Sequence, residues 1–324
     1  MKILITGVAG FIGYSLTKKL LNKKKTYNIY GCDSLNNYYS LSLKKNRLKE
    51  LITYKNFKFL KLNLKNNQKT KSFFYQNKFD IVIHLAAQAG VRYSVLNPKS
   101  YLDNNIISFF NVLDLSRKIK VKHFIFASTS SVYGNQFKFP TNENNNTDKP
   151  LSFYAATKKS NEVLAYSYSN IFKLPSTGLR FFTVYGPYGR PDMSPFIFIE
   201  SNLRKNKINL FGTGNQKRDF TYIDDIVLGI YKSRNLKKYN ILNLGNSKPI
   251  KINLLLENIE KFSNFKNLVS KLPPLIEDVE YTSANINKTK SLINWEPITK
   301  FENGIKNTFD WHVENGRWLR KIKI

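Results

Sequence analysis

The turn after the first apolar run constrains the fold of this chain more than any other segment. Residues 6–13, with the sequence TGVAGFIG, follow a strand-like run and open a segment with helical periodicity. Gly7 permits a tight turn, Gly10 lets the backbone approach a pyrophosphate at the helix N-terminus, and Gly13 allows the helix to pack closely on the strand. The sequence therefore predicts a dinucleotide-binding unit of strand, turn and helix.

An acidic residue, Asp33, follows the second apolar run at the spacing where a carboxylate accepts hydrogen bonds from an adenosine ribose. A carboxylate at this position repels a 2′-phosphate, so we expect the cofactor to be NAD rather than NADP. The G-x-x-G-x-x-G spacing of the turn is typical of short-chain dehydrogenases/reductases. The length of 324 residues indicates their extended branch.

Short apolar runs alternate with helix-length segments through the first half of the chain. Strand, helix and strand in this order predict a parallel sheet with helices on both faces. We expect strands at residues 2–6, 28–32, 57–60, 81–85, 123–128, 176–182 and 239–244. The predicted fold class is α/β, with a doubly wound parallel sheet of the Rossmann type.

A smaller C-terminal lobe is expected because the pattern loosens from Gly186 onward, where proline and glycine become frequent. We expect an NAD-binding Rossmann domain at residues 1–185, with return segments near 221–248. Residues 186–324 are expected to form mainly a substrate-binding lobe.

The chain is strongly basic, with 52 Lys and Arg against 22 Asp and Glu and a formal charge of +30. Such an excess first suggests nucleic acid or an acidic membrane surface. The lysines are scattered over the whole chain together with many Asn and Ile residues, which favours a compositional bias over a surface that tracks phosphates. We therefore expect no nucleic-acid partner.

Other compositional features point to a cytoplasmic protein. No run approaches the roughly 18 apolar residues that a membrane span needs, and the first residues lead directly into a strand. Cys32 is the only cysteine, so neither an intrachain disulfide nor a thiolate metal cluster can form. We expect no metal site and no membrane contact.

A Y-x-x-x-K pattern supplies the candidate catalytic groups. Tyr154 and Lys158 are four residues apart in a predicted helix whose N-terminus is signalled by Ser152, so the two side chains share one face. The ammonium of Lys158 and the positive charge of an oxidised nicotinamide would together lower the pKa of the phenol from its usual value near 10. Tyr154 can then act as a base. Residues 128–131 end a predicted strand and offer hydroxyls to a substrate alcohol.

These motifs together resemble the NAD-dependent nucleotide-sugar epimerase/dehydratase family, over nearly the whole chain. The segments that carry the resemblance are TGVAGFIG from Thr6, HLAAQAGVRYS from His84, ASTSSVYG from Ala127, SFYAATKKSNE from Ser152, GLRFFTVYGPYGRPDM from Gly178 and RDFTYIDDI from Arg218. Within the family the chain is most similar to the UDP-glucuronate 4-epimerase group, chiefly through residues 88–92 and 183–193.

The resemblance implies roles for individual residues. The implied catalytic set is Thr129, Tyr154 and Lys158. The implied cofactor-binding positions are Gly7, Gly10, Phe11, Ile12, Gly13, Asp33, Asn63, Leu64, Ala86, Ala87, Gln88, Asn104, Tyr154 and Lys158. Asn104 and Asn105 both match one polar position of the family, and the sequence does not choose between them. The implied substrate-binding positions are Arg92, Ser130, Thr183, Arg190, Arg218 and Asp278. The resemblance also implies a homodimer formed through a four-helix bundle.

Three departures from the family pattern bear on the substrate. Asn63 stands where relatives usually carry an Asp that accepts from the adenine amino group. Residues 275–278 replace a more polar stretch before the acid expected on the uridine ribose, and residues 211–214 resemble those of neutral-sugar epimerases.

The function implied is C4 epimerisation of a nucleotide sugar through a transient 4-keto intermediate, with UDP-glucuronate converted to UDP-galacturonate. Ser130 and Ser131 occupy the positions where related dehydratases and decarboxylases carry carboxylic acids, which disfavours elimination and decarboxylation. Arg190, and after it Arg92, are the candidates to bind a sugar carboxylate. The alternatives are a 4-epimerase of UDP-glucose or UDP-N-acetylglucosamine, and a non-catalytic NAD-binding or nucleic-acid-binding protein on the same fold.

Overall fold

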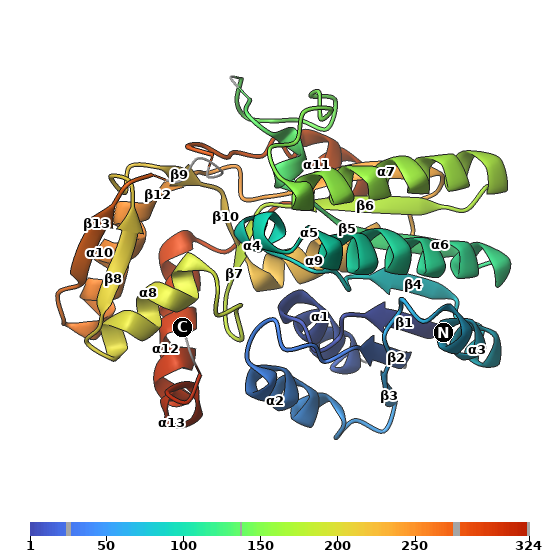
Figure 1. Ribbon diagram of the computed structural model, residues 1–324, viewed down its shortest axis with the longest axis horizontal. Helices are drawn as coiled ribbons and strands as arrows, with labels where there is room; N and C mark the ends of the chain where they lie inside the picture. The colour runs from blue at the N-terminus through green and yellow to red at the C-terminus, as the bar shows by residue number, and fades with distance from the viewer. Residues whose placement is uncertain (24–26, 137, 275–278, 323–324) are drawn as a thin grey trace.

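A parallel sheet forms the centre of the protein (Figure 1). The structure, a computed structural model, describes residues 1–23, 27–136, 138–274 and 279–322. In these residues the sheet has seven strands in the order β11-β6-β5-β4-β1-β2-β3, all paired in parallel. The strands are β1 (Lys2–Thr6), β2 (Asn28–Asp33), β3 (Phe57–Lys61), β4 (Ile81–His84), β5 (His123–Thr129), β6 (Ser176–Phe181) and β11 (Tyr239–Leu244). The α/β fold and all seven predicted strands are confirmed.

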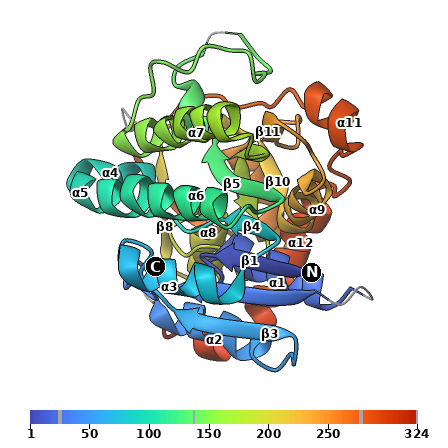
Figure 2. The same cartoon turned by 90° about the vertical axis from the view of Figure 1, so that its right-hand side faces the viewer.

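Helices cover both faces of the sheet, which is why its strands consist of nearly continuous apolar runs (Figure 2). On one face lie α1 (Phe11–Leu21), α2 (Leu41–Leu51) and α9 (Ile223–Ser233). On the other lie α3 (Asn67–Asn77), α6 (Ser108–Lys118) and α7 (Phe153–Phe172). Successive side chains of β1 point to opposite faces of the sheet. Ile3 and Ile5 pack with α1 and α9, whereas Leu4 packs with α3 and α6.

One helical stretch changes its winding along its length. It comprises α4 (Val91–Leu96), α5 (Pro98–Tyr101) and the π-helical turn η1 (Leu102–Ile107), which leads directly into α6. A 3₁₀ turn, η2 (Ser130–Tyr133), follows β5. Both π turns and sharp strand-to-turn transitions occur frequently at functional sites.

The remaining elements lie mostly beside the carboxyl edge of the sheet, on the left of Figure 1. Strands β8 (Lys207–Phe211) and β13 (Leu268–Leu272) pair in parallel, and helices α8 (Ser194–Leu203) and α10 (Ile252–Ser263) lie beside them. Helix α12 (Phe301–Glu314) packs on α8 and α10, and α13 (Gly316–Leu319) follows it at the bottom of Figure 1. Two small ladders join β7 (Thr183–Tyr185) to β10 (Phe220–Tyr222) and β9 (Lys217–Arg218) to β12 (Ile250–Lys251). Helix α11 (Asn287–Ile293) precedes α12.

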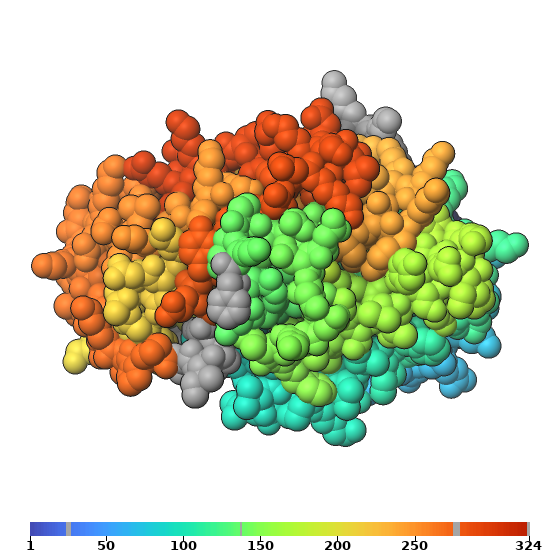
Figure 3. All heavy atoms as spheres, turned by 90° about the horizontal axis from the view of Figure 1, so that it is seen from above, coloured from blue at the N-terminus to red at the C-terminus, as the bar shows by residue number. Residues whose placement is uncertain are grey.

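A polar loop at residues 142–149 lies on the surface seen in Figure 3, coloured green beside the orange-red chain near residue 284. Backbone hydrogen bonds join residue 141, directly before this loop, to residues 283 and 285. The amide of Thr141 donates to the carbonyl oxygen of Ser283 at 2.8 Å, and the amide of Asn285 donates to the carbonyl oxygen of Thr141 at 2.8 Å. Late residues of the chain therefore hold the start of this loop in place.

Candidate active site

A cavity of about 350 Å³ opens at the carboxyl ends of β1 to β6. This is the edge at which doubly wound sheets bind their ligands, where the strand order reverses. Each of the six strands contributes a segment to the lining, and the loop after β7 adds Arg190 and Met193. Eighteen of the predicted site residues line it, namely Gly7, Gly10, Phe11, Ile12, Gly13, Asp33, Asn63, Leu64, Ala86, Ala87, Gln88, Asn104, Thr129, Ser130, Tyr154, Lys158, Thr183 and Arg190.

The glycine turn between β1 and α1 is shaped by close backbone contacts. Gly7 has a φ of +70°, and a Cβ atom there would lie 2.7 Å from the amide nitrogen of Ala86. A Cβ atom on Gly13 would lie 2.2 Å from the carbonyl oxygen of Gly7, so the helix packs directly on the turn. In the described chain no side chain caps α1. The amides of its first turn therefore suit a pyrophosphate, and the cradle fits a dinucleotide.

Asp33 reaches the cavity from the end of β2 and also holds the turn. One carboxylate oxygen accepts from the amide of Ala9 at 3.1 Å and the other from the amide of Leu35 at 2.8 Å. A carboxylate has about four acceptor positions, so capacity remains for a ribose. Cys32, next to it, is fully buried, and burial raises the pKa of its thiol well above the usual range.

The π turn η1 separates the roles of the two Asn residues that the sequence could not distinguish. Asn104 lines the cavity, and its amide nitrogen donates to the carbonyl oxygen of Ser100 at 2.7 Å. Asn105 is buried and exchanges two hydrogen bonds with the backbone of Gln88, at 2.7 and 3.0 Å. Its amide also donates to Thr157 on α7 at 3.0 Å, so Asn105 ties the segment after β4 to α7.

Asn63 lies at the far end of the cavity with Leu64 beside it. Its side-chain oxygen accepts a hydrogen bond from the amide of Lys65 at 3.1 Å. One of the two lone pairs of this oxygen therefore stabilises the local turn, and the other remains for an adenine amino group.

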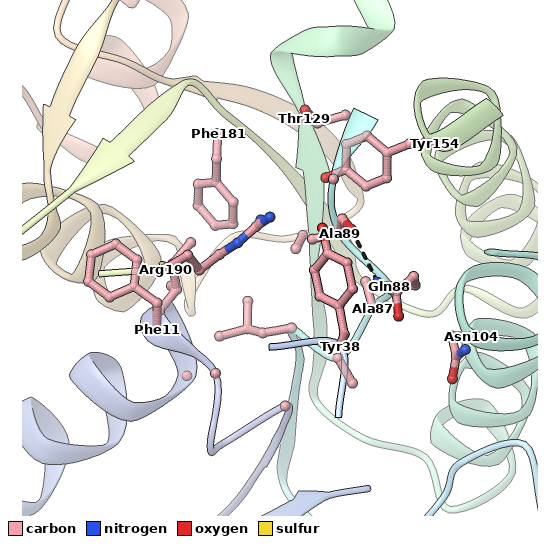
Figure 4. A pocket seen from close by; sticks show the side chains of 18 of the residues that line it. Phe11, Tyr38, Ala87, Gln88, Ala89, Asn104, Thr129, Tyr154, Phe181 and Arg190 are labelled. Atoms are coloured by element: carbon pink, nitrogen blue, oxygen red, sulfur yellow. Dashed lines mark hydrogen bonds between the residues drawn. The ribbon is translucent and has the colours of Figure 1, made fainter. Parts of the chain in front are cut away.

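Thr129 at the end of β5 and Tyr154 at the start of α7 lie side by side in the cavity (Figure 4), and Lys158 lines the same cavity. Helix α7 begins where predicted, because the hydroxyl of Ser152 accepts from the amide of Ala155 at 3.1 Å and caps it. Lys158 is almost fully buried, and its ammonium donates to the carbonyl oxygen of Ala127 at 2.9 Å. The hydroxyl of Thr129 donates to that of Ser131 at 3.1 Å.

The pKa values of Tyr154 and Lys158 show how the protein groups act on these two residues without a cofactor. Burial raises the pKa of Tyr154, although Arg190 and the Thr129 hydroxyl act to lower it. Burial lowers the pKa of Lys158 to about 8. The lowered phenol pKa expected from the sequence therefore does not arise from the protein groups alone. We expect the further positive charge of an oxidised nicotinamide to lower it.

Arg190 extends from the loop after β7 into the cavity, toward the rings of Tyr154 and Tyr38 (Figure 4). Its guanidinium forms an ion pair with Asp192 at 2.5 Å. The hydroxyl of Tyr38 donates to the same carboxylate at 3.0 Å. Asp192, in the same loop, thus holds Arg190 in place, and Tyr38, from the segment after Asp33, holds Asp192.

Two of the predicted substrate residues, Arg92 and Arg218, are not among the described residues that line this cavity. Arg92 lies with its guanidinium carbon 4.8 Å from the ring centre of Phe211. Arg218 donates to the carbonyl oxygens of Lys217 at 3.2 Å and Glu280 at 3.1 Å. Asp278 lies outside the described residues.

Sequence reasoning missed part of the lining. Residues between β2 and α2 contribute Ser34, Asn36, Tyr38 and Tyr39, and α2 contributes Lys44. Only the position of this segment, directly after the ribose acid, could have indicated its role. Among the described residues, no group of three His, Cys, Asp or Glu side chains is placed to bind a metal ion, and no helix is long and apolar enough to cross a membrane.

Comparisons with known proteins agree on one family. The model of the NAD dependent epimerase/dehydratase family matches residues 3–245. A UDP-glucuronate 4-epimerase of Thermodesulfobacterium geofontis is 45% identical over 322 residues, which cover 99% of each chain.

Two solved structures show the same fold. UDP-glucuronic acid 4-epimerase from Bacillus cereus, in complex with UDP-glucuronic acid and NAD, is 34% identical with a TM-score of 0.91, and the match covers 97% of this chain and 99% of that one. UDP-glucose 4-epimerase from Thermotoga maritima, with UDP-glucose, is 30% identical with a TM-score of 0.89 and the same coverage. This protein belongs to the NAD dependent epimerase/dehydratase family.

Proposed function

We propose that this protein is an NAD-dependent epimerase that inverts C4 of UDP-glucuronate to form UDP-galacturonate. The observation that carries the proposal is the position of Arg190 in the same cavity as Thr129, Tyr154 and Lys158. A guanidinium beside the reacting groups suits a sugar that carries a carboxylate. The similarity to enzymes named for this reaction supports the same substrate.

In the proposed reaction Tyr154 removes the proton from the sugar 4-hydroxyl, and Thr129 orients that hydroxyl. Bound NAD supplies the redox chemistry, accepting hydride from C4 and returning it to the opposite face of the 4-keto sugar. Tyr154 then returns its proton to the new hydroxyl. Lys158, whose ammonium is buried next to the catalytic strand end, keeps positive charge near the phenol and favours its ionised form.

Arg190 has a second task in this proposal. The 4-keto intermediate of a uronate is a β-keto acid, which loses CO₂ when its carboxylate is free to align with the carbonyl. An ion pair with Arg190 holds the carboxylate away from that geometry. Ser130 and Ser131, which line the cavity after Thr129, are not carboxylic acids and cannot protonate a leaving group as an acid would.

We infer the remaining substrate contacts from the family pattern. Thr183 lines the cavity and is assigned to the sugar or diphosphate. Arg92 is kept as the second candidate for the sugar carboxylate, Arg218 is assigned to the diphosphate, and Asp278 to the uridine ribose. The assignment of Arg218 requires the diphosphate to extend beyond the cavity toward β9, where Lys217 lies. In this reading residues 1–185, with the return near 221–248, bind NAD, and residues 186–324 mainly bind the UDP-sugar.

We also propose a homodimer formed through α6 and α7. Their outer faces carry a row of exposed apolar side chains, and apolar surface of this kind favours burial against a partner. The row consists of Phe110, Val163, Tyr166, Ile171 and Phe172, with Leu102 and Ile107 of η1 adjoining it. A second copy that presents the same two helices would complete a four-helix bundle. We assign the protein to the cytoplasm, where a single reduced cysteine is expected to persist.

The decisive experiment is incubation of the purified protein with UDP-glucuronate, followed by chromatographic separation of UDP-glucuronate from UDP-galacturonate. We expect conversion toward an equilibrium mixture without added NADH. A Y154F variant is the matched control and should show no conversion. Conversion of UDP-glucose or UDP-N-acetylglucosamine but not UDP-glucuronate would overturn the uronate assignment. Absence of any conversion, with salt-sensitive retention on DNA, would overturn the enzymatic proposal.

A further inference from the structure

Arg47, on α2, joins the cofactor turn to the loop that carries Arg190. One guanidinium nitrogen donates to the carbonyl oxygen of Ala9, inside the glycine turn, at 2.8 Å. The other terminal nitrogen donates to the carbonyl oxygens of Tyr188 at 2.6 Å and Gly189 at 3.2 Å. A single planar group therefore contacts both segments at once.

The environment of Arg47 is unusual for a cation. Its side chain is fully buried, and its charge is met by backbone carbonyls and by the Tyr39 hydroxyl at 2.8 Å. Within the described parts of the chain no carboxylate lies within ion-pair distance of it. Burial of a charge is unfavourable unless hydrogen bonds compensate for the lost water. Movement of the carbonyl groups that accept from Arg47 would break these bonds, so the carbonyl groups are held firmly in place.

Further contacts between the same two regions surround Arg47. Glu50, one turn further along α2, accepts a hydrogen bond from the hydroxyl of Tyr188. Tyr188 has a φ of +61°, so this loop residue adopts a conformation that needs outside support. Tyr38, just before α2, donates to Asp192, the ion-pair partner of Arg190. Both links, like the bonds of Arg47, run from the segment after the ribose acid to the loop of Arg190.

We propose that Arg47 is a positioning residue that couples NAD binding to the placement of the Arg190 loop. Because its guanidinium bridges Ala9 and residues 188–189, ordering the glycine turn around the pyrophosphate also orders the loop that holds the sugar carboxylate. The coupling makes each ligand bind more tightly when the other is present. This inference rests on the proposed function, since it assigns Arg190 to the substrate.

The test measures this coupling directly, in a Y154F background in which both ligands bind without turnover. The dissociation constant of NAD is measured by calorimetry with and without saturating UDP-glucuronate. We expect Y154F to bind NAD at least about fivefold more tightly when the sugar nucleotide is present. In R47M/Y154F the ratio should fall close to one, because methionine fills the space and donates no hydrogen bond.

Two further variants keep the test decisive. Lys45 is exposed on the same helix, so K45M/Y154F should keep the ratio of the Y154F parent. R47K/Y154F retains the charge, but one ammonium cannot span both carbonyl groups as the planar guanidinium does. Its ratio should lie at least about twofold below the parent, and it carries the test if R47M fails to fold.

An unchanged ratio in R47M or R47K would overturn the inference, and so would an equal loss in K45M. A second readout is the fate of the substrate in the otherwise unaltered enzyme. A loosened Arg190 loop allows the C5–C6 bond of the 4-keto sugar to break. The electron pair passes to C5 as an enolate, which is then protonated, and CO₂ leaves while the cofactor stays reduced. We expect R47M to release more CO₂ per turnover than K45M, and equal release would count against the proposal.

Failure of the proposed function can be distinguished from failure of the Arg47 inference. In that case the unaltered protein would not convert UDP-glucuronate at all. Failure of the Arg47 inference alone would leave conversion normal and the coupling ratio unaffected by R47M.

Discussion

Glu162 on α7 and Arg180 on β6 form an ion pair of 2.8 Å, with both side chains 4% exposed. The hydroxyl of Ser128, which lines the cavity next to Thr129, donates to the same carboxylate at 2.6 Å. Glu162 therefore fastens the helix that carries Tyr154 both to β6, through Arg180, and to the strand end that carries Thr129, through Ser128. Its position between two catalytic elements makes it a structural support of the site.

Removal of one member of this pair should destabilise the protein strongly. E162Q leaves the buried guanidinium of Arg180 without its counter-charge, which typically costs about 3–5 kcal/mol of the free energy of unfolding. The double variant E162Q/R180M should lose less than E162Q, because no uncompensated charge remains. Urea unfolding measures both. The exposed pair of Lys290 and Glu296 provides the control, and E296Q should change little.

Replacing Tyr154 should separate binding from chemistry. We expect Y154F to lose about 10²–10⁴-fold in turnover while still binding NAD and the UDP-sugar, since a general base typically contributes that much. Tyr168 lies on the same helix, so Y168F should retain activity. Full activity in Y154F would exclude it as the base.

The pKa of Tyr154 should depend on the cofactor. Burial raises this pKa in the protein alone, so phenolate should appear at a lower pH after oxidised NAD is added. The difference in tyrosinate absorbance between wild type and Y154F, recorded with and without NAD, measures the effect. Identical titrations in the two conditions would contradict this assignment of the charge.

Lys158 should make stability depend on pH in alkaline solution. Its pKa is about 8 in the folded protein against 10.5 for the free side chain. Below pH 8 both states bind the proton, and the folded state bears the cost of a buried ammonium. Between the two values only the unfolded state keeps the proton, so the free energy of unfolding contributed by Lys158 rises with pH, by about 3 kcal/mol in total. Denaturant unfolding of NAD-free wild type and K158M isolates this contribution.

In that comparison the stability of wild type relative to K158M should increase from pH 7 to pH 10. A difference that stays constant over this range would show that Lys158 does not change its protonation there.

Arg190 should distinguish substrates by their carboxylate. R190M should lower kcat/KM for UDP-glucuronate by more than tenfold, because a charge-assisted hydrogen bond is worth about 1.5–3 kcal/mol. UDP-glucose lacks the carboxylate, and any residual activity with it should change less. Equal losses for both sugars would mean that Arg190 only ties its loop to Asp192, the partner of its ion pair.

A charged residue introduced on the outer face of α6 should dissociate the proposed dimer into monomers. Phe110 and Leu292 are both 44% exposed, but only Phe110 lies on the proposed interface. F110E should elute as a monomer in size-exclusion chromatography with light scattering, while L292E should behave as wild type. An unchanged dimer in F110E would exclude this face.

The sequence predicted the sheet well because its signals are local. Buried parallel strands appear as apolar runs, and the glycine spacing reflects backbone contacts within a single turn. Tyr154 and Lys158 were found for the same reason, since a spacing of four within one helix needs no knowledge of tertiary structure.

Contacts between distant segments could not be predicted in this way. Arg47 is one basic residue among many, and only the folded chain brings it to Ala9 and Tyr188. The different roles of Asn104 and Asn105 depend on the π turn, which has no simple periodicity in the sequence. Arg92 contacts Phe211 of β8 and Arg218 belongs to the β9–β12 ladder, so both form contacts that their own segments do not predict.

The buried position of Cys32 makes the protein convenient for site-specific labelling. It is the only cysteine in the chain, it is inaccessible, and burial disfavours its thiolate, which is the form that reacts with maleimides and iodoacetamides. A cysteine introduced on the exposed surface, for example in place of Lys45, would therefore be the sole reactive thiol without removal of any native residue. A fluorophore attached there would report on the surroundings of α2 when ligands are added.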